Sequence, residues 1–295
     1  MRFLNKTNID FISKQKIAGF LSITLIVAGI ASLIIKGGPL LSIDFTGGTV
    51  AQVKFEIPVE LGQLRETLSD YGFEGAEIVE FGSPDEVLIK TQFSGSSSEI
   101  SEKLTLALGN SFTLRRVESV GPKIGKELQS DALKAIGLAL ILILIYITFR
   151  FDRYYALGSV MALIHDVLIT LGVFSLLDYE INLSIIAAFL TIVGYSLNDT
   201  IVVFDRIREN IPKLMKKTLN DVVNISLNET LNRTVITSLT TMMVVVILFL
   251  WGGKVINLFA FALIIGVFVG TYSSLFVASP VMVYFEKRSA GPYKK

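Results

Sequence analysis

The run IAGFLSITLIVAGIASLII, residues 17–35, decides the fold class of this chain. It contains no charged side chain, and Lys16 and Lys36 bound it on its two sides. A helix of this length rises about 28 Å at 1.5 Å per residue, close to the thickness of a bilayer core, about 30 Å. The run is longer than the apolar core of a signal peptide and no small-x-small cleavage site is apparent, so we expect an uncleaved anchor.

Comparable apolar runs recur along the chain and predict six membrane-spanning helices. Hydrophobic residues make up 52% of the sequence and charged residues 18%, whereas soluble domains average about 25% charged residues. Together with a mean hydropathy of +0.61, this composition excludes an ordinary soluble globular protein. The expected spans are residues 17–35, 132–149, 154–177, 181–204, 234–253 and 256–285.

An acidic domain separates the first two expected spans. Residues 37–131 contain 8 Lys/Arg and 15 Asp/Glu, whereas the rest of the chain contains 19 Lys/Arg and 11 Asp/Glu. We therefore assign residues 36–131 to an extracytoplasmic domain. Its apolar spacing predicts the order strand, helix, strand, strand, helix, strand, which is typical of a ferredoxin-like α+β domain with a docking or force-transmitting role. The expected elements are residues 50–55, 61–71, 76–81, 87–91, 99–108 and 112–120.

Lysine and arginine in the short connections predict the orientation. Sixteen of them lie in the terminal tails 1–16 and 286–295 and in the connections 150–153 and 205–233, whereas the short connections opposite hold Lys254 alone. Both termini are therefore expected in the cytoplasm. A nucleic-acid or partner surface would also explain basic loops, but the insertion rule explains them without any partner.

The connection 205–233 contains one amphipathic segment. Its apolar residues, which alternate with lysines and polar residues, are Leu214, Leu219, Val222, Val223 and Ile225. This pattern is typical of a helix that lies on the membrane surface. We expect that position for the segment rather than a binding motif.

Four ionisable residues fall within or at the edge of the expected spans: His165, Asp166, Asp199 and Arg233. Each costs at least about 2.5–3.5 kcal/mol at a bilayer centre, so each is a functional hypothesis. Asp199 lies roughly 9 Å inside the basic end of its span, and Arg233 opens the next span from the same side. Burial favours the neutral form of a carboxyl group and a neighbouring cation favours the charged form. A carboxylate balanced between the two can load and release a proton, while a static buried ion pair is the alternative.

Polar residues flank this pair. Asp199, Arg233, Asn198, Ser196 and Thr237 form the candidate proton pathway, with Thr200 beside it. A stripe at helical spacing opens the fifth span and comprises Thr234, Thr237, Ser238 and Thr241. Serine and threonine also serve as ordinary contacts between membrane helices, so the stripe alone leaves both interpretations open.

His165 and Asp166 lie near the middle of the third span. Being consecutive on a helix, they point about 100° apart and cannot both face one pathway squarely. A structural hydrogen bond to a neighbouring helix and proton transfer both remain open. Gly266 and Gly270 form a small-xxx-small pair in the sixth span, which favours close helix packing.

The composition also limits the chemistry. No cysteine and a single histidine exclude disulfides and thiol nucleophiles and make a zinc site implausible, so we expect no metal, cofactor or catalytic residue. Asp166 and Asp199 on neighbouring spans could share a proton, as in an intramembrane aspartyl protease. Against this, Asn198 replaces the glycine that precedes the aspartate in those enzymes, and Arg233 would hold a carboxylate ionised.

Three strings resemble motifs of a known family. GYSLNDTIVVFDRIREN (residues 194–210) resembles the fourth-span signature of the SecF family of protein-export membrane proteins, in the resistance–nodulation–division superfamily. IDFTGGT (43–49) and VGPKIGKEL (120–128) are similar to two further motifs of that family, and His165-Asp166 and Asn232-Arg233-Thr234 also fit its pattern. The family-motif residues in the strings are Asp44, Gly47, Gly48, Gly121, Pro122, Gly125, Asp205 and Arg206.

The resemblance implies an accessory subunit of the Sec translocase in the bacterial inner membrane. It implies a SecD-like partner, sometimes YajC, beside the SecYEG channel, with unfolded preprotein as substrate and SecA acting before it. Proton flow would drive late export, with Asp199 as the protonatable residue and Arg233 as its cationic modulator. The remaining surroundings would be membrane lipid, with no nucleic acid.

Other functions remain open at this point. A half-transporter of the same superfamily that exports a small molecule or a lipid would have a similar layout. A purely structural scaffold would tolerate Asp199→Asn. Sodium is an alternative coupling ion, because oxygen ligands suit it.

The distribution of basic residues makes a topological prediction. A reporter fused at Ser97 should read extracytoplasmic, and one fused at Lys216 should read cytoplasmic, because lysine and arginine are retained on the cytoplasmic side during insertion. Paired alkaline phosphatase and fluorescent-protein fusions at the two sites measure this. The opposite reading at either site would contradict the orientation.

Overall fold

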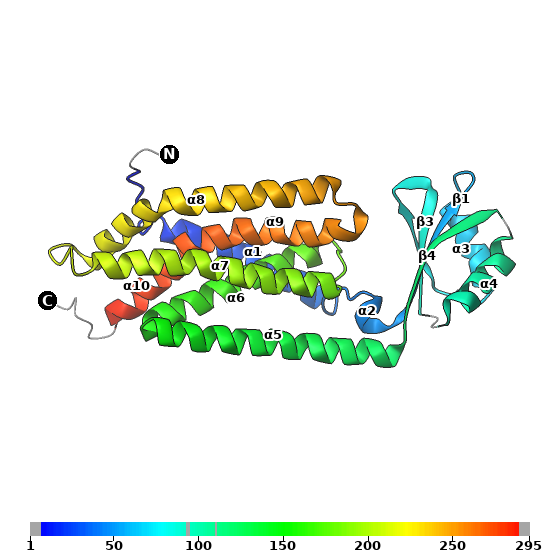
Figure 1. Cartoon of the computed structure of the whole chain (residues 1–295), viewed down its shortest axis with the longest axis horizontal. Coiled ribbons are helices and arrows are strands. Elements are labelled where there is room, and N and C mark those ends of the chain that lie inside the picture. Colours follow the sequence, from blue (N-terminus) through cyan, green and yellow to red (C-terminus); the bar gives the residue numbers. More distant parts are fainter. Residues whose placement is uncertain (1–6, 93–94, 110, 289–295) are drawn as a thin grey trace. The chain divides into compact units, whose positions relative to one another are not determined.

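The computed structural model describes residues 7–92, 95–109 and 111–288. It divides into a helical unit, Met1–Leu40 with Ala135–Lys295, and an outer unit, Leu41–Lys134. Figure 1 shows the two units, one made of long helices and one built on a sheet. Basic residues 2, 6, 294 and 295, on which the orientation partly depends, lie outside the described ranges, as does the side chain of Lys254.

Six helices in the described ranges are long and apolar enough to cross a membrane. The sixth helix is continuous through a π-helical turn before Pro280. Proline has no backbone N–H to donate, and its ring would clash with the carbonyl group four residues earlier in a regular α-helix. The helices are α1 (Gln15–Ile35), α5 (Pro122–Arg150), α6 (Arg153–Leu176), α7 (Leu183–Asn210), α8 (Leu219–Trp251) and α9 (Lys254–Ser273), which continues through Ser274–Ala278 into α10 (Ser279–Arg288).

Small residues let these helices approach closely. An added Cβ on Gly29 of α1 would come within 2.6 Å of the Cα of Gly172 on α6, so the two backbones touch at this crossing. On α9, an added Cβ on Gly270 would lie 3.1 Å from the Cβ of Ser196 on α7, and one on Gly266 would collide with Ile192. The expected packing role of Gly266 and Gly270 is therefore confirmed.

The segment 205–233 differs from its expected form. It is not a surface loop: α7 runs on to Asn210, and α8 begins at Leu219 and continues into the membrane-spanning part without a break. Thr218 caps α8 in a capping box with Asp221. Leu219, Val222 and Val223 are buried in the core of the helical unit, so they do not lie on the membrane surface. Leu214 lies in the short turn between the two helices.

The residues before α1 pack onto this extension of α8. Phe11 and Ile12 are buried, and their backbone N–H groups donate to Asn224 Oδ1 at 3.0 and 3.1 Å. Asn224 Nδ2 donates in turn to Asp10 Oδ1 at 2.7 Å. Hydrogen bonds from the Ser13 backbone N–H and from Asn224 hold the pKa of Asp10 below its usual value, so this contact weakens as pH falls through that pKa.

The outer unit contains a four-stranded antiparallel sheet in the order β2-β3-β1-β4. Its elements follow one another as helix, strand, helix, strand, strand, helix, strand. They are α2 (Ile43–Thr46), β1 (Gly48–Phe55), α3 (Leu61–Ser69), β2 (Glu77–Phe81), β3 (Ser83–Thr91), α4 (Ser97–Leu108) and β4 (Phe112–Val120). A separate core of buried side chains, including Leu68, Ile89, Ile100 and Leu104, lies between the sheet and the helices α3 and α4.

Two of the motif strings meet in the outer unit. Gly47 (φ +74) and Gly48 (φ +131) adopt backbone conformations that favour glycine. An added Cβ on Gly47 would lie 2.7 Å from the Cα of Pro122, and one on Gly125 would lie 3.0 Å from the Gly47 nitrogen. The motif glycines therefore form a close joint between α2, β1 and the first turn of α5, with Asp44 in the first turn of α2 beside them.

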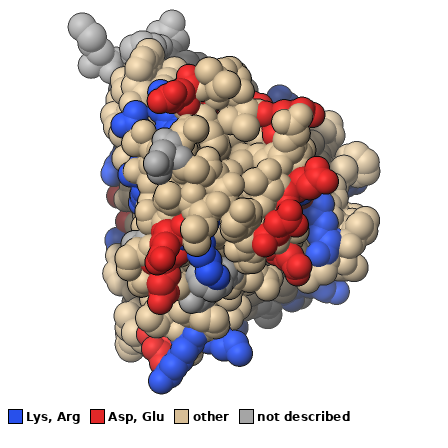
Figure 2. All heavy atoms as spheres, turned by 90° about the vertical axis from the view of Figure 1, so that its right-hand side faces the viewer, with Lys and Arg blue, Asp and Glu red and all other residues tan. Residues whose placement is uncertain are grey.

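The charge of the outer unit is not gathered on one face. Figure 2 shows acidic side chains in several separate patches, with basic side chains beside some of them. Ion pairs within the outer unit include Lys54 with Asp85 at 3.3 Å and Lys90 with Glu77 at 3.8 Å. The excess of acidic residues thus gives no single anionic docking surface in this view.

The separate core of the outer unit makes a stability prediction. Residues 41–120, expressed without the spans, should unfold cooperatively in a chemical denaturation followed by circular dichroism. Leu68→Ala should lower the free energy of unfolding by about 2–5 kcal/mol, because Leu68 is fully buried. Val79→Ala, at a residue 40% exposed, is the matched control and should change it by less than about 0.5 kcal/mol. A non-cooperative transition would contradict an independent core.

Candidate functional site

Asp199 occupies a core position on α7. The buried residues of this helix recur every three or four positions, and Asp199 falls in that series between Ser196 and Val203. Its side chain is only 3% exposed. The sequence therefore places a carboxyl group on the face of α7 that packs against the other helices.

The carboxyl group of Asp199 is only partly satisfied. Its Oδ2 is buried and makes no hydrogen bond within the described part of the chain, and the same holds for the Thr234 hydroxyl on α8. Ser238 of α8 lies next to the carboxyl group. An unpaired buried polar atom costs about 1–3 kcal/mol, so a group that can bind or release a proton here has a large effect on local stability.

Arg233 is near Asp199 but does not pair with it. Its charge acts on the Asp199 carboxyl group, yet no nitrogen–oxygen distance between the two side chains falls within 4.0 Å. Arg233 is exposed on the surface of the helical unit, whereas Asp199 is buried. The structure therefore does not contain the static ion pair that the sequence left open as an alternative.

The other residues of the candidate pathway make their described hydrogen bonds elsewhere than to Asp199. Ser196 donates to Asp166 at 2.5 Å. Thr237 donates to the carbonyl oxygens of Arg233 and Thr234 on its own helix, at 3.1 and 2.9 Å, as threonine often does in helices. Asn198 is exposed, because one residue's rotation along α7 turns it away from the face of Asp199.

Asp166 is the centre of a fully satisfied network. It is 0% exposed. Its Oδ2 accepts hydrogen bonds from Ser196 of α7 at 2.5 Å and from Ser273 of α9 at 2.8 Å. Its Oδ1 lies 2.8 Å from Nδ1 of His165. Both carboxyl oxygens are therefore occupied, in contrast to Asp199.

The network continues through His165 to α1. His165 Nε2 lies 2.9 Å from the Ser22 hydroxyl, which lies 3.0 Å from the hydroxyl of Tyr272. Tyr272 donates to the Ala18 carbonyl oxygen at 2.7 Å. One chain of hydrogen bonds thus connects α1, α6, α7 and α9.

His165 and Asp166 both make the structural hydrogen bonds to neighbouring helices that the sequence left open, and they also contact each other. Their Cα–Cβ directions differ by about 100°, but the imidazole reaches back to the neighbouring carboxylate and the pair acts as one unit. The partners Ser22, Tyr272 and Ser273 were not identified from the sequence. The polar run Thr271-Tyr272-Ser273-Ser274 within the apolar sixth span was the signal that could have found two of them.

Ser238 belongs to a smaller polar group beside Asp199. Its hydroxyl lies 2.6 Å from the Thr271 hydroxyl and accepts a hydrogen bond from Tyr195 at 3.2 Å. Thr271 and Tyr195 were not expected as site residues. This group joins α7, α8 and α9 at the position of Asp199, so a change in the charge of Asp199 acts where three helices meet.

The two aspartates therefore have different chemistry. Asp166 is bound on both oxygens and connects α6, α7 and α9, whereas Asp199 retains an oxygen that can take a proton. The hydrogen bonds of Asp166 go to His165 and two serines, so the aspartates do not share a proton as the protease alternative requires. In the described residues, no group of three His, Cys, Asp or Glu could hold a metal ion.

Comparison with known proteins gives consistent matches. A family model described as "Protein export membrane protein SecD/SecF, C-terminal" matches residues 100–288. "Protein translocase subunit SecF" of Calditerrivibrio nitroreducens is 47% identical over 292 residues, covering 96% of this chain and 95% of the relative. The relative of that name from Vibrio alginolyticus is 47% identical over 277 residues, covering 92% and 88%.

Two solved structures are similar over almost the whole chain. The crystal structure of SecDF, a translocon-associated membrane protein from a Thermus species, matches with a TM-score of 0.86 and 40% identity. It covers 96% of this chain, which spans 39% of the length of that one. SecDF in a super-membrane-facing form matches with a TM-score of 0.72 and 39% identity, covering 97% of this chain and 40% of that one.

The network around Asp166 makes a stability prediction. Asp166→Ala should lower the thermal unfolding midpoint of the purified chain in detergent by about 4 °C or more, because it leaves three buried partners without their acceptor. Asn198→Ala, at an exposed position on the neighbouring helix, is the control and should leave the midpoint within about 1 °C. Equal midpoints for the two variants would show that the network contributes nothing to stability.

Proposed function

Because the chain belongs to the SecD/SecF family of protein-export membrane proteins, we propose that it is a SecF-type translocase subunit that couples proton movement to protein export. The curated relatives named protein translocase subunit SecF are 39–47% identical to it. They support the translocase assignment. The proton-coupled step is supported by the state of Asp199 in the helical unit.

The proposal includes a SecD-like partner. The solved SecDF chain is more than twice as long as this one, which matches 39% of it, so the remainder is available for a SecD-like part. By family resemblance, the assembly acts on unfolded preprotein beside the SecYEG channel, with YajC as a further component. SecA acts on the preprotein at an earlier step. The basic residues of the short connections support an orientation with both termini in the cytoplasm. The bacterial inner membrane is proposed from the family resemblance.

The single observation that carries the proton step is the unpaired Oδ2 of Asp199. It is buried within a membrane-spanning helix and has no hydrogen-bond partner among the described residues. Burial favours the neutral carboxyl group and the charge of Arg233 favours the carboxylate. A group under these opposing influences changes its protonation when water reaches it from one side of the membrane or the other.

The membrane potential supplies enough free energy for this step. Moving one charge through 100 mV releases about 2.3 kcal/mol. At about 1.4 kcal/mol per tenfold, this shifts a two-state equilibrium about fifty-fold. A proton on Asp199 removes the attraction to Arg233, and α7 and α8 can then repack. At this depth the neutral hydroxyl groups of Tyr195 and Ser238 form a hydrogen bond between these two helices.

The outer unit is proposed to be a ferredoxin-like domain that engages the exported chain or a partner subunit. Its element order, strand-helix-strand-strand-helix-strand after α2, supports this assignment. The sheet order β2-β3-β1-β4 with all neighbours antiparallel also fits it. The close joint of Gly47, Gly48 and Gly125 supports a role in transmitting movement, because the backbone before β1 contacts the first turn of α5 directly.

The test is protein export into inverted membrane vesicles with and without an imposed proton gradient. Asp199→Asn keeps the size of the side chain and should abolish the gradient-dependent part of export while the ATP-driven part survives. Arg233→Met should impair the same part. Replacing the proton gradient with a sodium gradient distinguishes the coupling ion.

The matched control is Asp166→Asn, the same substitution at the other buried aspartate. It should retain the gradient-dependent part in proportion to the amount of folded protein, because Asp166 is fully bound. If Asp199→Asn vesicles respond to the gradient as the unmodified protein does, Asp199 has no part in coupling and the proposal fails.

A further inference from the structure

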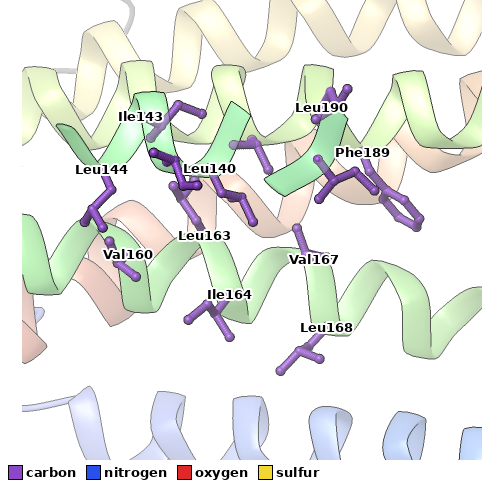
Figure 3. Close-up of a pocket in the computed structure, with 13 residues that line it drawn as sticks. Leu140, Ile143, Leu144, Val160, Leu163, Ile164, Val167, Leu168, Phe189 and Leu190 are labelled. Carbon is purple, nitrogen blue, oxygen red and sulfur yellow. The ribbon is translucent and has the colours of Figure 1, made fainter. Parts of the chain in front are cut away.

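An apolar groove lies between α5 and the helices α6 and α7. Its volume is about 360 Å³, and all thirteen side chains that line it are apolar. Figure 3 shows Leu140, Ile143 and Leu144 of α5 opposite Leu163 and Val167 of α6, with Phe189 of α7 at one end. All three helices belong to the set that can span a membrane, so the groove lies at the depth of the hydrocarbon core.

Within the helical unit, α5 is anchored near its C-terminal end. Ile147 of α5 is fully buried in the core of the helical unit. Three residues later, Arg150 donates to both carboxylate oxygens of Asp205 on α7, at 2.9 and 2.8 Å. Further from this contact the side chains of α5 are mostly exposed, among them Leu138 at 59% and Leu142 at 57%. Away from this contact, α5 therefore leaves much of its apolar surface uncovered by the rest of the helical unit.

The groove is partly open, so its lining contacts whatever surrounds the helices. Left unfilled within a bilayer core, the lining side chains would forfeit dispersion contacts. A cavity of about 150 Å³ lined by Leu, Ile and Phe already binds benzene, and this groove is more than twice that volume. Water does not suit it, because a buried water needs two to four polar partners. The occupant is therefore an apolar group.

The groove runs along α5. From Ile136 to Leu144 it follows this helix over eight residues, or about 12 Å. An apolar chain that lies along α5 can contact the lining side chains over this length.

A basic residue lies at the anchored end of the groove. Arg153 is the first residue of α6 and is exposed, and within the described ranges it has no carboxylate at ion-pair distance. Its guanidinium carbon lies 4.9 Å from the ring centre of Tyr154. Val160, which lines the groove, is seven residues further along α6, or about 10 Å. Arginine at the membrane interface attracts anionic lipid headgroups.

We propose that the groove binds one acyl chain of an anionic phospholipid whose headgroup contacts Arg153. The acyl chain occupies the space between α5 and α6 and completes the packing of α5 against the bundle. The site is independent of the proposed proton step, because neither Asp199 nor Arg233 lines it.

Photolabelling of the purified full chain in detergent tests this. The probe is phosphatidylglycerol with a diazirine in its acyl chain, added in trace amount, and labelled residues are identified by mass spectrometry. Label should concentrate on groove residues such as Leu140 and Val167 severalfold over the outward residues Leu138 and Leu142. The same acyl chain on phosphatidylcholine should label the groove less, and Arg153→Gln should remove that difference.

A variant that fills the groove provides the control. Val167→Phe should lower groove labelling about tenfold, the loss expected when two buried methylene groups no longer fit. Leu142→Phe adds similar bulk to the outward face and should leave groove labelling unchanged. Only variants whose thermal unfolding midpoint equals that of the unmodified chain are compared. Uniform labelling of all faces of α5, or groove labelling that Val167→Phe does not change, would overturn the proposal. So would exclusion of the probe from the groove by a helix of a co-purified subunit.

Discussion

The free-energy cost of burying a carboxyl group in the membrane is the constraint on which the rest of this structure depends. The chain meets that cost at two positions in two ways. Asp166 uses both oxygens, through His165, Ser196 and Ser273, so that a polar group becomes the junction of the bundle. Asp199 keeps Oδ2 without a hydrogen-bond partner among the described residues. The first arrangement fixes helices, and the second leaves a group whose protonation changes their packing.

Close helix packing makes the first arrangement possible. The contact of Gly29 with Gly172 brings α1 against α6, and only then does Ser22 reach His165. The approach of Gly270 to Ser196 likewise brings α9 close to α7, where Ser273 joins the same carboxylate. Hydrogen bonds and small residues are the main contributions to helix association in lipid, and here each depends on the other. By contrast α5 lies outside the network, and a groove lies beside it.

Several of these features follow from the sequence, and the reasons for the others are physical. Long apolar runs predict the six candidate membrane helices, because a helix crosses the bilayer core when its apolar stretch is long enough. The alternation of apolar residues also predicts the order of strands and helices in the outer unit. The extension of α8 was missed because an amphipathic segment is compatible with a membrane surface and with a protein core. Only the tertiary packing shows that Val222 is buried in the protein. The direction of Ser196 depends on which neighbour comes closest, and a single sequence does not contain that information.

Of the two buried aspartates, we propose that only Asp199 exchanges a proton. Infrared difference spectroscopy of the purified chain, recorded between alkaline and acidic pH, detects a carboxyl group directly through the carbonyl stretch that appears on protonation. We expect a band from a buried carboxylic acid that is absent in Asp199→Asn and present in Asp166→Asn. A band that persists in Asp199→Asn and disappears in Asp166→Asn would contradict it.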